Sequence, residues 1–104
     1  LVTTVESLPA ARLHPILVGV LVKPFDVGGS LYRVNPLKKS CVPLVSGRVK
    51  GAPVEPVAWT HMYRGGRIFY TSLGHPKDFQ LPAFRRLLKN AILWSLKKDS
   101  GGGE

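Results

Sequence analysis

The stretch VAWTHMYRGGRIFYTSL, residues 57–73, decides the fold that we expect. β-Branched and aromatic residues fill its two halves, and such residues favour strands. Alternation along the first half assigns side chains to two faces, one with Val57, Trp59, His61 and Tyr63 and the other with Ala58, Thr60 and Met62. Gly65-Gly66 separates the halves, and glycine accepts the positive φ that a tight turn demands. The stretch therefore predicts a β-hairpin at 57–73.

A helix is predicted downstream of the hairpin, over residues 82–98. Pro82 suits the first helical position, and Lys97 and Lys98 suit the carbonyl end of the helix dipole. Spacing of three and four residues predicts an apolar stripe made of Phe84, Leu87, Leu88, Ala91, Ile92 and Leu96, with Asn90 outside it. A helix with one apolar stripe must cover something, and the sheet of the hairpin is the expected partner. Residues 99–104, ending in Gly-Gly-Gly-Glu, read as a flexible tail or linker.

The front part of the chain gives weaker signals. Residues 4–13 tolerate a helix but contain Pro9, and His14-Pro15-Ile16 predicts a turn or a short helical turn. Short strands are expected at 30–34 and at 42–45, where Pro43 confines the second one to an edge or a strand start. The two glycines and two prolines within 47–56 predict a loop.

Length and charge bound the class of protein. The 104 residues suffice for one small domain, without an initiator methionine or a signal-peptide pattern, so we expect a soluble piece of something larger whose localisation stays open. The apolar run 16–22 is seven residues long, against roughly 20 for a membrane span, so no membrane partner is expected. Net charge is +9, but the basic residues are spread along the chain, which favours a solvated basic surface over nucleic-acid binding.

A family resemblance rests on four segments of the sequence. They are Glu55-Pro-Val-Ala-Trp-Thr, Gly66-Arg-Ile-Phe-Tyr-Thr-Ser-Leu-Gly-His75, Phe84-Arg-Arg-Leu-Leu and Asn90-Ala-Ile-Leu-Trp94. Together they are similar to the C-terminal end of trehalose-utilisation (ThuA-like) domains. The resemblance implies an α/β fold, namely the C-terminal part of a flavodoxin-like, class I glutamine-amidotransferase-like three-layer domain. It also implies that residues 1–98 form that portion and that the rest of the parent domain lies upstream of residue 1.

His75 is the main candidate site residue. In the amidotransferases that this fold resembles, a histidine after a late strand is a triad base, followed by proline and a carboxylate. His75-Pro76 matches, but position 77 is lysine, which leaves Asp78 as the candidate orienting carboxylate. Imidazole suits acid/base work near neutral pH, and ligand crevices form at the carboxyl ends of strands. The alternative is that His75 caps the following turn or donates a hydrogen bond to a loop carbonyl.

Two further residues are candidates for contacts with substrate. Gly74 has no side chain, so a substrate could approach closely beside His75. His14, in its turn before Pro15, could point into the same crevice. Both are expectations about the shape of the crevice rather than about chemistry.

Structural roles are expected for the remaining residues that resemble parts of a site. His61 is more typical of a hydrogen-bonded sheet residue than of a ligand, and the spacing of the histidines matches no zinc motif. Cys41 could be a reactive thiol, but no histidine is near it in sequence, which favours a small apolar residue. The paired glycines lack the spacing of a phosphate-binding loop, and no cofactor is expected.

Three functions follow as hypotheses. The first is an enzyme domain of carbohydrate metabolism, acting on a trehalose-type sugar or another small polar metabolite. The second is a non-catalytic sugar-binding or accessory domain with a decayed amidotransferase-like site, which Lys77 favours. A weaker third is a basic module for polyanions. A second copy of the chain is a possible partner, because an exposed sheet edge invites association.

Overall fold

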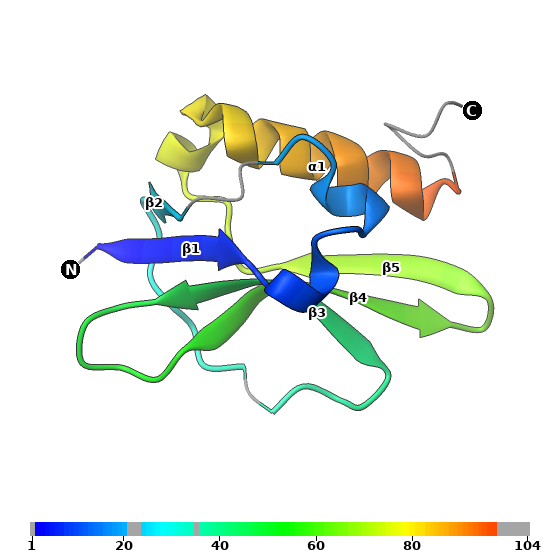
Figure 1. The fold of residues 1–104 in the computed structure, drawn as a ribbon, viewed down its shortest axis with the longest axis horizontal. Coiled ribbons are helices and arrows are strands. Elements are labelled where there is room, and N and C mark those ends of the chain that lie inside the picture. The colour runs from blue at the N-terminus through cyan, green and yellow to red at the C-terminus, as the bar shows by residue number, and fades with distance from the viewer. Residues whose placement is uncertain (1, 21–23, 35, 98–104) are drawn as a thin grey trace.

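The computed structural model describes residues 2–20, 24–34 and 36–97. In these residues the chain forms a five-stranded sheet in the order β2-β1-β3-β4-β5, and every pair is antiparallel. The strands are β1 (Thr3–Ser7), β2 (Phe25–Val27), β3 (Cys41–Arg48), β4 (Glu55–Tyr63) and β5 (Gly66–Thr71). Helix α1 (Pro82–Ser95) lies across one face of the sheet (Figure 1). The chain is thus a sheet-dominated α/β unit with a C-terminal helix, as expected in outline.

The predicted hairpin is confirmed, with a shift at its turn. β4 and β5 pair directly, from Tyr63 opposite Gly66 to Ala58 opposite Thr71. The two turn residues are Arg64 and Gly65, with φ of 49° and 82°. Two successive positive φ values are typical of the type I′ turn, whose twist matches the strands. The turn therefore uses Arg64-Gly65 rather than Gly65-Gly66, and Gly66 begins β5.

Helix α1 begins at Pro82 as predicted, but its buried face is rotated. Phe84, Leu87 and Ala91 are buried as expected, whereas Ile92 and Leu96 are 61% and 64% exposed. Asn90 and Trp94 take the buried places. The cause is a second contact surface: the Asn90 amide donates to the carbonyl oxygens of Ile16 and Val18, at 2.8 and 2.6 Å.

The helix is also shorter than predicted. It ends at Ser95, and Lys97 takes a left-handed conformation with φ of 62°, which stops helical propagation. Lys98 and the predicted tail at 99–104 lie outside the described residues.

The front of the chain departs most from expectation. The helix-tolerant segment 4–13 begins as strand β1, whose side chains alternate between buried and half-buried. A 3-10 turn, Pro9–Ala11, follows it. The expected helical turn after His14 is confirmed as Pro15–Leu17, which packs beside α1. The predicted strand at 30–34 is wrong: these residues have no regular structure, and the neighbour of β1 is β2 instead.

The predicted strand at 42–45 lies within the longer β3, which is the middle strand of the sheet. Pro43 is nevertheless at a local edge, because pairing with β1 stops at Val45 and only β4 flanks Pro43. The predicted loop at 47–56 shrinks to 49–54, since both its ends are in strands. Gly47 pairs within β3, and the position needs glycine because a Cβ there would lie 2.8 Å from Val57 Cγ1.

The core lies between the sheet and α1. Its fully buried members come from every layer and include Val5, Ile16, Leu44, Val57 and Leu87.

Among the described residues, no helix is both long and apolar enough to cross a membrane.

Candidate functional site

His75 occupies the loop between β5 and α1, as the sequence predicted. It caps the 3-10 turn Pro76–Gln80, and its Nδ1 accepts a hydrogen bond from the backbone N–H of Lys77 at 3.1 Å. His75 therefore caps the turn that follows it, which was the structural alternative to a catalytic role. Because the Nδ1 lone pair is engaged, the neutral ring carries its proton on Nε2. The ring nitrogen left for a ligand is thus an N–H donor.

Asp78 is completely buried and organises the same loop through the main chain. Its Oδ2 accepts from the backbone N–H groups of Gly74 and His75, each at 3.1 Å, and its Oδ1 accepts from Gly28 N–H at 2.8 Å. Charge-assisted bonds of this kind are stronger than neutral ones. The carboxylate therefore fixes where His75 sits, through backbone contacts rather than through the imidazole.

Gly28 brings a distant segment into the site. A Cβ at this position would lie 2.8 Å from His75 Nδ1, so only glycine permits the approach. From the sequence, the paired glycines were considered as a phosphate-binding loop, and the contact of Gly28 with His75 was not predicted. The pairing of two glycines was a usable signal, since close backbone approach is one reason for glycine.

A depression of about 540 Å³ opens beside His75. Its lining combines three glycines, two serines, an aromatic ring, a leucine and the imidazole: Gly28, Gly29, Gly74, Ser30, Ser72, Tyr32, Leu73 and His75. Gly74 has φ of 135°, a conformation that side chains rarely adopt, and a Cβ there would meet no atom within 4 Å. Its requirement for glycine is therefore conformational rather than steric.

His14 is not brought to this depression. It caps the turn Pro15–Leu17 by accepting the Ile16 N–H at 3.1 Å. Its ring lies 5.3 Å from the ring of Trp94, at the C-terminal end of α1, whereas His75 precedes the N-terminal end. Of the four predicted site residues, the structure thus gathers Gly74, His75 and Asp78, and leaves His14 apart.

The chemistry open to His75 follows from its hydrogen bonds. In a serine- or cysteine-type triad, the base donates Nδ1–H to a carboxylate and keeps Nε2 free to take a proton. Here Nδ1 accepts instead, so the arrangement favours hydrogen-bond donation from Nε2. Action as a base at Nε2 would require the Lys77 capping bond to break.

A second pairing escaped the sequence interpretation. Cys41 and His61 are directly opposite each other on β3 and β4, with Sγ 4.0 Å from Nδ1. The reading of Cys41 as a plain apolar residue relied on the lack of a nearby histidine in sequence. Sheet register supplies one, and local spacing gives no signal for it. No group of three or more potential metal ligands occurs within the described residues.

Comparison with known proteins identifies the family of this chain. Searches of curated proteins and of solved structures each found no significant match. The model of the ThuA family, described as trehalose utilisation, matches residues 3–95. That range includes β1 to β5, the His75 loop and all of α1. This chain therefore belongs to the ThuA trehalose-utilisation family.

Proposed function

We propose that the protein acts in the metabolism of trehalose-type sugars and binds such a sugar in the depression beside His75. The observation that carries the proposal is the composition of the lining, which sets an imidazole among serines and glycines. Family membership supports the pathway, and the lining supports the ligand class.

A sugar needs both donors and acceptors, because each hydroxyl plays both roles. Ser30 and Ser72 offer hydroxyls, and the glycines leave main-chain groups uncovered by side chains. Tyr32, which is 59% exposed, offers a flat ring against which an apolar sugar face can lie. Within this lining, His75 is the donor at Nε2, either as polar anchor or as the acid that protonates a leaving oxygen.

A non-catalytic binding role is the second candidate, and two observations favour it. Lys77 stands where the resemblance leads one to expect a carboxylate. Both carboxylate oxygens of Asp78 already accept hydrogen bonds, from three backbone N–H groups. An imidazole without an orienting carboxylate binds hydroxyls well but is a weaker proton relay.

The finer fold and the partners belong to the same proposal. We place residues 1–98 as the C-terminal part of a flavodoxin-like three-layer domain, with the rest of that domain as the partner of the described sheet. Family membership supports this placement, as does the covering of one sheet face by α1.

The experiment uses two variants of His75. Asparagine is a good helix cap, so His75→Asn keeps the cap and removes the imidazole, whereas His75→Ala removes both. We expect His75→Asn to bind trehalose about tenfold more weakly with an unchanged melting temperature, because one hydrogen bond is worth about 1.4 kcal/mol here. His61→Asn serves as the matched control and should bind as the parent does.

Calorimetric titration measures the affinity, and NMR of labelled trehalose measures turnover. Binding without turnover supports the second candidate over the first. Equal trehalose affinity in His75→Asn and the parent would contradict both.

A further inference from the structure

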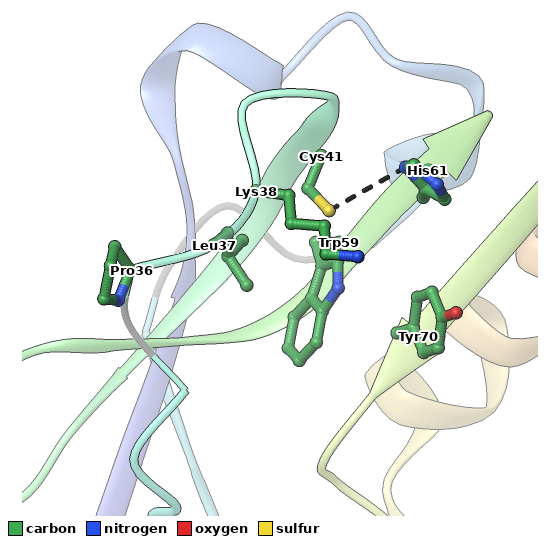
Figure 2. Close-up of a pocket in the computed structure, with 7 residues that line it drawn as sticks. All are labelled: Pro36, Leu37, Lys38, Cys41, Trp59, His61 and Tyr70. Carbon is green, nitrogen blue, oxygen red and sulfur yellow. Dashed lines mark hydrogen bonds between the residues drawn. The ribbon is translucent and has the colours of Figure 1, made fainter. Parts of the chain in front are cut away.

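A second pocket lies on the sheet face opposite α1. It has a volume of about 310 Å³ and shares no lining residue with the depression at His75. Its walls come from β3, β4, β5 and the segment before β3: Pro36, Leu37, Lys38, Cys41, Trp59, His61 and Tyr70 (Figure 2). Phe69 packs beside α1 with Leu88 and Ala91, so its neighbour Tyr70 points to the other face.

An aromatic pair forms one wall of this pocket. Trp59 and Tyr70 are direct partners across β4 and β5, with ring centroids 5.8 Å apart and an angle of 19° between the planes. Their near-parallel rings are held by the sheet register rather than by flexible loops. Such a wall suits the flat face of an apolar ligand.

The charge of the pocket selects against cations. Lys38 lines it, and none of its lining residues is acidic. Net charge over the whole sequence is +9, so the surrounding field has the same sign. A small anion fits this environment better than a neutral or cationic ligand.

A nucleophile and a potential base meet in the same pocket. Cys41 Sγ and His61 Nδ1 point toward each other at 4.0 Å (Figure 2). Ser40 Oγ lies 3.1 Å from the same nitrogen, so the hydroxyl and the thiol compete for Nδ1, which can take the thiol proton when the hydroxyl does not donate to it. A thiol within reach of an imidazole is the usual arrangement of an activated cysteine.

We propose that this pocket binds small carboxylates, most tightly those with a flat apolar body, and that Cys41 is a nucleophile toward electrophilic carboxylates. Lys38 attracts the carboxylate, and the Trp59–Tyr70 wall receives the flat body. With iodoacetate, an S–C bond forms as the C–I bond breaks. Iodide leaves with the bonding electron pair, and the thiol proton passes to His61 Nδ1.

The first test compares an anionic reagent with a neutral one. Iodoacetate and iodoacetamide are reacted with the folded and the urea-unfolded chain, and mass spectrometry follows Cys41, the single cysteine. Folding should raise the iodoacetate-to-iodoacetamide rate ratio. Lys38→Gln should lower that ratio roughly fivefold, as expected for loss of one charge a few ångströms from the reagent in water.

Lys89→Gln is the matched control, because it removes the same charge from an exposed position on α1, which covers the other face of the sheet, and Lys89 does not line this pocket. It should leave the ratio unchanged. Equal ratios in the folded and unfolded chain, or equal effects of the two lysine variants, would overturn the proposal.

The second test addresses the aromatic wall and the base. Benzoate should slow carboxymethylation of the parent, acetate at the same concentration should not, and Trp59→Leu should abolish the protection. His61→Gln should slow both reagents by a similar factor, since the base acts on the thiol and not on the carboxylate. Circular dichroism confirms that each variant is folded. Protection by acetate equal to that by benzoate, or alkylation unaffected by His61→Gln, would refute the assignment.

Discussion

At the scale of single residues, the carboxylate of Asp78 organises the His75 site. It has no exposed surface, and it accepts hydrogen bonds from three backbone N–H groups, one at Gly28 and two at Gly74 and His75. The sequence placed it near His75 but suggested that it would orient the imidazole. The spacing of three residues between them equally fits a capping box, which is what the structure contains.

Asp78→Asn is expected to destabilise the protein by about 1–3 kcal/mol, because the amide can replace only one of the two accepting oxygens. Its NH₂ group would also face backbone donors. Urea unfolding measures the loss. Asp26→Asn is the control, since Asp26 accepts a hydrogen bond from Thr4 at an exposed position, and its effect should stay within about 0.5 kcal/mol. Similar losses in the two variants would contradict this role for Asp78.

At the scale of elements, helix α1 shows where a local pattern misleads. The apolar spacing predicted Ile92 and Leu96 inside and Asn90 outside, whereas the structure has the reverse. The pattern assumes one contact surface, but α1 packs against both the sheet and the turn Pro15–Leu17. The polar side chain is buried because its amide satisfies main-chain carbonyls from that turn.

This reversal gives a sharp comparison between two alanine variants two residues apart. Asn90→Ala should lower the free energy of unfolding by about 1–3 kcal/mol, because it leaves a buried carbonyl without its hydrogen-bond donor. Ile92→Ala should change that free energy by no more than about 0.5 kcal/mol. Asparagine and isoleucine have similar helix propensities, so replacement by alanine changes the propensity by a similar amount in both variants. Thermal or urea unfolding of the pair decides it. A larger loss for Ile92→Ala would support the stripe predicted from sequence and contradict the packing of α1.

The elements that the sequence predicts well are those specified by near neighbours. The hairpin follows from alternation around the Arg64-Gly65 turn, and the helix start follows from Pro82. Strands β1 and β2 pair across twenty or more residues, so no local signal identifies them. The same reason hides the hydrogen bond from Gly28 to Asp78 and the Cys41–His61 pair, whose partners lie fifty and twenty residues apart along the chain.

At the scale of the whole molecule, the described sheet ends in two edge strands, β2 and β5, and β5 is the one beside α1. Among the described strands, β5 pairs with β4 alone. Beside it lies an apolar groove of about 310 Å³ lined by Phe69, Leu88, Ala91, Ile92, Ser95 and Leu96. An unpaired edge next to exposed apolar side chains favours association through strand addition.

The chain is therefore expected to self-associate with rising concentration, which sedimentation velocity measures. Ile92→Lys should shift the equilibrium toward monomer by placing a charge in the groove. Leu13→Lys is the matched control: it replaces an equally apolar residue that is 97% exposed and outside the groove. A monomer at all concentrations, or equal effects of the two variants, would contradict association through this edge.

The contact between Gly28 and Asp78 also sets an order of events during synthesis. The two residues are fifty positions apart, and a ribosome makes the chain from its N-terminus. A nascent chain that has completed β4 already contains Gly28 but has no acceptor for its N–H. The depression at His75 can therefore form only after the chain has emerged as far as Asp78, so a translation product that is truncated before this residue lacks it.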